Sequence, residues 1–259
     1  MPYLYLTNRI SSNLYNFIER NEPLFDYWGR TFYCNSFQLV IGKDRAVLID
    51  TGMGYGDLIR QTSLYTDLPV ELLITHSDLD HRRGAYQFVD AGRKIYMSSM
   101  EVQPVKESEK FPYTDLHDGD VFDLGGIVLK TIHVPGHSKG SMCFLDSENN
   151  RLFSGDAVNK LPWLMNGRGG TIASYLESLK RLRELTPGKP DIFCGHAWEY
   201  YPYKVLLDSI TACEDVLAGS SATDRHYLIP FNQKAPEVED IYEHQVGNVR
   251  LCYSTKFIR

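Results

Sequence analysis

The stretch Thr75-His76-Ser77-Asp78-Leu79-Asp80-His81 places four potential metal ligands within six residues. It directly follows the run Glu71–Ile74, which is typical of a β-strand. Imidazole and carboxylate groups at this density converge only where the chain turns tightly, and burying them is costly unless a cation neutralises the carboxylates. A simpler alternative is that Asp78 or Asp80 caps a helix that begins there. The stretch therefore predicts a metal site or a capped helix at the end of a strand.

Three later strand ends also carry a candidate ligand directly after a glycine. They are the runs Val134–His137, Leu152–Asp156 and Ile192–His196. Glycine lets the backbone approach its surroundings closely, and open α/β sheets bind ligands beyond the carboxyl ends of their strands. Four such elements in order along the chain indicate one shared site.

The pattern around these motifs is that of an α/β protein with two sheets covered by helices. Ser36–Ile41 and Ala46–Ile49 flank the turn-like Gly42–Arg45 and predict a β-hairpin. Further strands are predicted at Val70–Thr75, Lys94–Met97, Ile127–Val134, Ser141–Leu145, Arg151–Ser154, Asp191–Cys194 and Val249–Tyr253. Helices are predicted at Thr171–Leu185, with capping-box spacing at Ser174 and Glu177, and at Tyr203–Leu217.

We expect one domain over residues 1–259 with decorated ends. Residues 1–33 are aromatic-rich, and Pro23 and Gly29 interrupt any long helix, so an irregular segment is expected there. Residues 219–259 open with the short spacer Gly219–Ala222 and continue as a polar C-terminal decoration.

Composition narrows the classes of function. The 27 basic and 33 acidic residues give a net charge of −6, which disfavours a general nucleic-acid binder. No apolar run is long enough for a transmembrane helix, and the first residues lack an export signal, so we expect a cytoplasmic protein without a membrane partner. The five cysteines are scattered without a CxxC pair, which predicts reduced, mostly buried thiols.

The order of the motifs resembles the metallo-β-lactamase-fold hydrolases, a superfamily that includes glyoxalase II. The resemblance spans roughly residues 35–196 and begins with Val47–Gly52, which is similar to the family's strand ending in Asp-Thr-Gly. It continues through the His-rich loop, the Pro-Gly-His turn, the Ser-Gly-Asp strand end and the final Gly-His. This resemblance implies a four-layer αββα sandwich with a two-metal centre along one edge of the sheets.

The resemblance also implies a role for each motif residue. The first metal would be held by His76, Asp78 and His137. The second would be held by Asp80, His81 and His196, with Asp156 bridging both ions. Asp50 matches a position that supports the site without binding metal, and Asp80 would also orient the nucleophile as the catalytic residue.

One residue departs from the family pattern, because the commonest loop has histidine where Asp78 stands. Two divalent cations bring a charge of +4, while Asp78, Asp80 and Asp156 bring −3, one negative charge more than the commoner loop. Zinc is the metal that the family implies, whereas the extra carboxylate suits iron or manganese. Flavodiiron proteins of the same fold also have a carboxylate at this position.

The resemblance implies hydrolysis of an ester, thioester, lactone or amide of a small molecule by a metal-bridging hydroxide. The alternatives are a carboxylate-rich di-iron redox or gas-binding protein of flavodiiron type, a phosphodiesterase or nuclease, and a non-catalytic binding module. A P-loop is absent from the sequence, which excludes the common NTPase motif.

For most polar and aromatic residues outside the motifs we expect a structural role rather than a catalytic one. His117, His226 and His244 are expected at the surface or in loops, and His133 is not expected to bind metal. Lys160, Trp163 and Arg168 follow Asp156 in a Gly-rich segment that could contact substrate, although an exposed loop is the simpler expectation. Cys194 is expected to pack within its strand, and Trp198–Tyr203 either lines a pocket or packs on the sheet.

Overall fold

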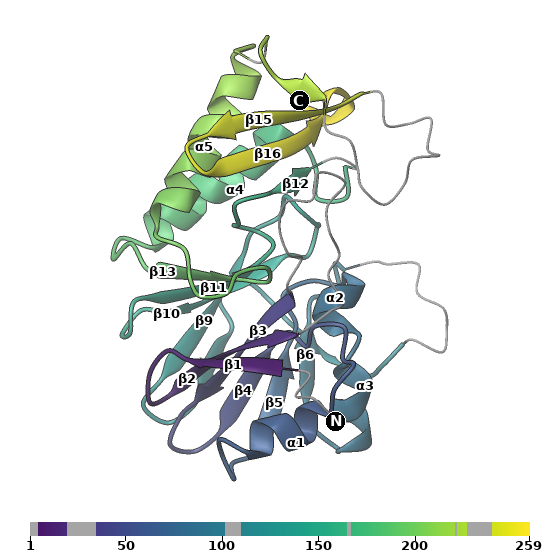
Figure 1. Ribbon diagram of the computed structural model, residues 1–259, viewed down its shortest axis with the longest axis vertical. Helices are drawn as coiled ribbons and strands as arrows, with labels where there is room; N and C mark the ends of the chain where they lie inside the picture. The colour runs from purple at the N-terminus through teal and green to yellow at the C-terminus, as the bar shows by residue number, and fades with distance from the viewer. Residues whose placement is uncertain (1–4, 20–34, 102–109, 165–166, 221, 227–239) are drawn as a thin grey trace.

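Three β-sheets and five α-helices make up the computed structural model, which describes residues 5–19, 35–101, 110–164, 167–220, 222–226 and 240–259 (Figure 1). The first sheet has seven strands in the order β1-β2-β3-β4-β5-β6-β7. Their bounds are Tyr5–Arg9, Leu14–Glu19, Asn35–Ile41, Ala46–Ile49, Val70–Leu73, Ile95–Met97 and Thr114–Asp115. Neighbours from β1 to β4 are antiparallel, and neighbours from β4 to β7 are parallel.

The second sheet has five strands in the order β13-β11-β10-β9-β8. The bounds of β8, β9, β10, β11 and β13 are Val121–Asp123, Val128–His133, Met142–Asp146, Arg151–Gly155 and Asp191–Cys194. Only β11 and β13 run parallel in this sheet, and the long helix between them makes the crossover that a parallel pair requires.

Helices cover the outer faces of both sheets. The short helices α1, α2 and α3, at Leu58–Ser63, Leu79–Arg82 and Ala85–Asp90, belong to the first half of the chain. The longer helices α4 and α5, at Ile172–Leu185 and Lys204–Leu217, pack on the second sheet (Figure 1). Among the described residues, no helix combines the length and the apolar character needed to cross a membrane.

Side-chain alternation in β4 divides the core into layers. Leu48 and Ala46 pack outward with Phe88 of α3, whereas Val47 and Ile49 pack inward. The inward residues meet side chains of the second sheet, including Leu129, Phe144 and Phe153. Because both faces of β4 are buried, its sequence is a continuous apolar run. The layers therefore follow the order helix, sheet, sheet, helix.

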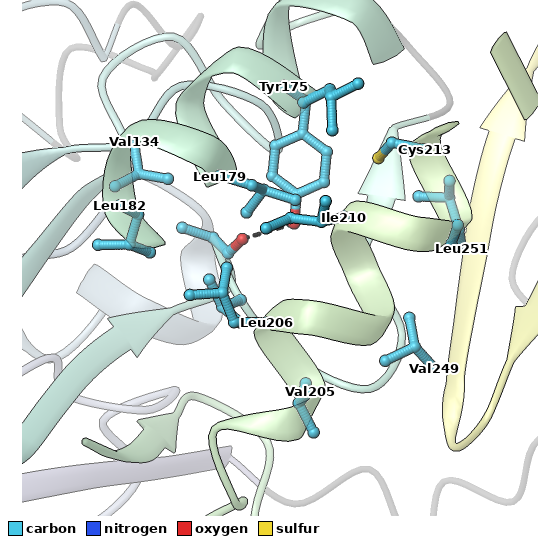
Figure 2. Packing of buried hydrophobic residues seen from close by; sticks show 14 of the residues in the cluster. Val134, Tyr175, Leu179, Leu182, Val205, Leu206, Ile210, Cys213, Val249 and Leu251 are labelled. Atoms are coloured by element: carbon cyan, nitrogen blue, oxygen red, sulfur yellow. Dashed lines mark hydrogen bonds between the residues drawn. The ribbon is translucent and has the colours of Figure 1, made fainter. Parts of the chain in front are cut away.

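A third sheet lies beyond α5, in the order β12-β16-β15-β14. Its strands are Trp163–Leu164, Val249–Ser254, Ile241–Val246 and Arg225–His226, and a short 3-10 helix, η3, follows at Thr255–Phe257. Figure 2 shows Val249 and Leu251 of β16 beside Cys213 and Ile210 of α5, in the same apolar cluster as Tyr175 of α4. The C-terminal residues are therefore an integral layer of this half of the protein.

Three expectations from the sequence were wrong. Residues 5–19 form the antiparallel β1–β2 hairpin rather than an irregular segment, and Pro23 and Gly29 lie outside the described residues. The two expected sheets are accompanied by a third. The capping box of α4 joins Thr171 and Ser174, because Thr171 has the extended backbone that a cap requires. The other predicted strands and helices occur within two residues of their expected bounds.

Candidate metal centre

Four loops at the carboxyl ends of strands bring the candidate ligands together. A Cβ at Gly155 would overlap the side chain of Thr75, and a Cβ at Gly195 would overlap the ring of His81. Only glycine allows these loops to approach so closely. The backbone also joins the two sheets here, since Met142 N donates to Thr75 O at 2.9 Å. The glycines before Asp156 and His196 thus have the role that the sequence predicted.

The structure places all seven candidate ligands in three overlapping groups whose ligand atoms lie within 4.8 Å of one another. The first group is His76, Asp78 and His137, and the second is Asp80, His81 and His196. The third group, His76, His81 and Asp156, overlaps both of the others. The structure thus brings together the residues of each expected ligand set, and it places Asp156 near one histidine of each set, whereas metal binding by them stays a prediction.

In the first group, Asp78 Oδ2 lies 3.0 Å from His137 Nε2 and 3.5 Å from His76 Nε2. In the second, His196 Nε2 lies 3.6 Å from Asp80 Oδ2 and 3.2 Å from Asp156 Oδ2. The other oxygen of Asp156, Oδ1, lies 3.8 Å from His81 Nε2. Asp156 therefore presents one oxygen to each of two imidazoles of the second group.

Three buried polar atoms in this cluster have no hydrogen-bond partner among the residues that the structure describes: His76 Nε2, His81 Nε2 and Asp156 Oδ1. Leaving a buried donor or acceptor unpaired costs about 1–3 kcal/mol per group. All three belong to the same candidate group, and imidazole nitrogens and carboxylate oxygens are the donors that zinc accepts in proteins. The residues present therefore fit a bound cation.

Asp50 fixes the orientation of His81. Its Oδ2 lies 2.8 Å from His81 Nδ1, and its Oδ1 accepts a hydrogen bond from Thr75 N at 2.8 Å. Asp50 has a φ of 64°, which turns the chain at the end of β4 and aims the carboxylate at these partners. A carboxylate behind a histidine holds the ring and its tautomer in the manner typical of metal sites.

Glu101 is a residue of the site that the sequence did not indicate. One carboxylate oxygen accepts hydrogen bonds from Ser77 N and Ser77 Oγ at 2.9 and 2.7 Å, and the other accepts one from Gly140 N at 2.7 Å. Ser77 separates two ligands, and Gly140 follows the turn of His137. Glu101 thus ties together both loops of the first group. It stands in a loop without a motif, and no spacing in the sequence signals it.

The charges of the ligands are strongly coupled. Burial alone would raise the pKa of Asp156, but His196 and His81 outweigh burial and hold it well below its usual range. Burial likewise lowers the pKa of His81, but Asp50, Asp156 and Asp80 raise it to about 10. The raised pKa of His81 favours a proton on its ring, and a metal that binds this imidazole must displace that proton.

Asp78 occupies the position of the N-cap of α2, yet its side chain makes no capping hydrogen bond. Its carboxylate faces the histidines instead, so the alternative of a helix cap does not account for this residue. His133 lies outside the three groups, and its Nε2 pairs with Lys139 O at 2.7 Å.

Two expectations for residues beyond the motifs were wrong. His244 is buried, at 8% exposure, and lies between Asp224 and Asp215 at 2.7 and 3.2 Å. Arg168 is not simply part of an exposed loop, because its guanidinium lies 2.6 Å from Asp78 Oδ1.

The remaining residues outside the motifs lie as follows. His117 and His226 are exposed, as expected, and Lys160 lies 4.2 Å from the ring centre of Tyr201. Trp163 forms part of β12, and its carbonyl oxygen lies 3.2 Å from His137 Nδ1. Cys194 is buried in β13, and Cys143, Cys213 and Cys252 are buried as well, whereas Cys34 lies outside the described residues. Trp198 and Tyr200 are exposed, whereas Tyr203 packs with α5.

The chain is similar in sequence to proteins that are named as thioesterases or as zinc-dependent hydrolases. The human acyl-coenzyme A thioesterase MBLAC2 is 32% identical over 188 residues, 57% of this chain and 66% of that protein. The atrochrysone carboxyl ACP thioesterase AgnL7 of Paecilomyces divaricatus is 30% identical over 194 residues, 71% of this chain and 55% of that protein. The probable polyketide biosynthesis zinc-dependent hydrolase BaeB of Bacillus velezensis is 29% identical over 165 residues, 62% of this chain and 71% of that protein.

A solved metallo-beta-lactamase from Pontibacter korlensis superposes with a TM-score of 0.67, covering 80% of this chain and 97% of that one. At 22% identity this likeness shows the fold alone, and it confirms the predicted sandwich. The match spans less than two thirds of the length of each of the two thioesterases. The sequence profile of the metallo-beta-lactamase superfamily matches residues 29–196, a segment that contains every candidate ligand. The chain therefore belongs to the metallo-beta-lactamase superfamily.

Proposed function

We propose that the chain is a metal-dependent hydrolase that cleaves acyl thioesters or related esters of small molecules. The observation that carries the proposal is the cluster of His76, His81 and Asp156, which takes one histidine from each ligand set and holds three buried atoms without a hydrogen-bond partner among the described residues. In this proposal two divalent ions, zinc in the first place, are held by the seven clustered residues.

A divalent ion held there supplies Lewis acidity toward the acyl oxygen and lowers the pKa of water toward 7. The chain's own residues then orient the reaction. Asp80 has the most exposed carboxylate of the three acidic ligand candidates, with 27% of its side chain accessible, against 22% for Asp78 and 12% for Asp156. It is therefore the residue best able to accept a hydrogen bond from the attacking water. Asp80 would take a proton from the water as the water oxygen bonds to the acyl carbon, and it would pass that proton to the sulfur as the carbon–sulfur bond breaks.

A thioester suits this site better than an amide. The thiol of cysteine has a pKa of about 8.5, and a thiol of similar acidity leaves as a thiolate near neutral pH with little help from an acid. An amine leaving group must be protonated before the bond breaks, and Asp80, the most accessible of the three acidic ligand candidates, would have to supply that proton. The names of two relatives, both thioesterases, favour the same substrate class.

The test is a substrate panel with protein loaded with zinc, manganese or iron. We expect an acyl thioester to be cleaved fastest, an ester or lactone more slowly, and a phosphodiester not at all. Asp80→Asn should lose most of the activity, and the exposed carboxylate of Asp90 provides the control Asp90→Asn, which should keep it. Thioester hydrolysis that survives complete metal removal, or a metal-loaded protein that cleaves only phosphodiesters, would contradict the proposal.

A further inference from the structure

The two oxygens of Asp78 have different partners. Oδ2 faces the histidines of the first group, 3.0 Å from His137 Nε2 and 3.5 Å from His76 Nε2. Oδ1 accepts a hydrogen bond from Arg168 at 2.6 Å. The pair is largely withdrawn from solvent, since 22% of the Asp78 side chain and 33% of the Arg168 side chain are accessible. One oxygen is therefore directed to the candidate metal position, and the other to a cation of the protein.

The segment that carries Arg168 is built against the first group. A Cβ at Gly169 would overlap the carbonyl of Gly136, so only glycine lets this segment lie on the turn that precedes His137. Trp163 of β12 helps to orient His137, because Trp163 O lies 3.2 Å from His137 Nδ1. Arg168 is thus placed by backbone packing as well as by its ion pair.

The third sheet holds this segment in turn. Trp163 of β12 pairs with Cys252 of β16, and Cys252 N donates to Pro162 O at 2.9 Å. The ring of Phe257 lies where a Cβ of Gly167 would be. Strand β16 and η3 follow residue 196, beyond the end of the superfamily match. Part of the support of the first group thus comes from residues that the match does not include.

We infer that Arg168 is a positioning residue that makes Asp78 act on the first metal as a histidine would. This inference rests on the metal centre proposed above. A histidine offers one donor atom and no net charge. Asp78 with Oδ1 bound to Arg168 also offers one oxygen, Oδ2, and the two formal charges cancel.

The ion pair between Arg168 and Asp78 affects which metal the first group prefers. Zinc prefers four ligands in tetrahedral geometry, which one oxygen of a carboxylate satisfies. Manganese accepts more oxygen ligands, so a carboxylate that binds through both oxygens suits it better. Arg168 holds Oδ1 and thereby favours zinc, which offsets the preference for iron or manganese that the carboxylate alone would give.

The experiment compares the ratio of manganese to zinc affinity in a double-mutant cycle, measured by competition with a chelator. Arg168→Leu removes the charged partner of Oδ1 and should raise the ratio by about tenfold, the lower end of what partners of metal ligands contribute. Arg168→Lys retains a cation and should stay close to wild type. In an Asp78→His background, Arg168→Leu should leave the ratio unchanged, because an imidazole has no second oxygen to release.

Asp78→Asn replaces Asp78→His in the cycle if the histidine variant does not fold. An equal shift of the ratio in both backgrounds, or no shift in either, would overturn the role of Arg168 while leaving the metal centre intact. A wild-type protein that binds neither ion would instead overturn the metal centre itself.

Discussion

Glu101→Gln should destabilise the protein although the change removes no volume. The carboxylate accepts from Ser77 N and Ser77 Oγ on one oxygen and from Gly140 N on the other. Glutamine has one acceptor oxygen, so its amide nitrogen must face either Gly140 or Ser77, and a donor there is left unpaired. With 9% of Glu101 exposed, solvent replaces little of the loss, and the expected cost is about 3 kcal/mol.

Urea denaturation of the metal-free protein measures this cost. Glu184 lies exposed on α4, so Glu184→Gln is a matched control that should change the stability by less than about 0.5 kcal/mol. A Glu101→Gln variant as stable as this control would refute the argument that Glu101 ties the two loops together.

The pH dependence gives a second readout. Burial would raise the pKa of Glu101, but His76 and hydrogen bonds from Ser138 and Ser77 hold it below its usual value. The carboxylate therefore stabilises the fold above its unfolded pKa of about 4.3, and this contribution is lost as pH falls below that value through the lower pKa of the folded state. Glu101→Gln should flatten that acidic limb of the stability profile. A limb of unchanged slope would contradict the assignment.

Three further predictions concern the ligands. Asp50→Asn should weaken metal binding about tenfold, because an amide cannot hold the His81 ring and its backbone partner as the carboxylate does, and unchanged affinity in chelator competition would contradict this. Asp156→Ala should lose most of the bound metal whereas His133→Ala should keep it, and equal loss by elemental analysis would show that the wrong residues were chosen. Metal added at pH 7 should release protons into a weakly buffered indicator solution. The reason is that Asp156 outweighs burial and raises the pKa of His196 above its usual value, so a proton on the ring must leave when metal binds. Metal loading without proton release would argue against direct ligation by this histidine.

The ligand loops could be predicted because their signals are local. A strand, a glycine and then an imidazole or carboxylate are adjacent in the sequence, and Gly155 and Gly195 do allow the close approach that this pattern implies. The hairpin of β3 and β4 was equally visible, since β4 is a continuous apolar run, β3 ends in one, and a polar turn separates them.

The features that the sequence did not reveal depend on partners far along the chain. Asn16 is a polar residue in the middle of β2, and its amide donates to Ala197 O, 181 residues away. His244 is buried because Asp224 and Asp215 receive its ring nitrogens. The pairing of Arg168 with Asp78 spans 90 residues. From the sequence alone, an isolated polar residue is predicted to lie at the surface. Its burial becomes favourable only when the fold brings a hydrogen-bond partner to it, and that partner is distant in the sequence.

The central claim is that the seven clustered residues bind metal, and the most direct measurement is elemental analysis of protein purified without chelator, combined with an anomalous-scattering map. We expect about two ions per chain, one at His76, Asp78 and His137 and one at Asp80, His81 and His196, with Asp156 between them. Trace metal only, with no anomalous peak beside His76 or His81, would contradict it.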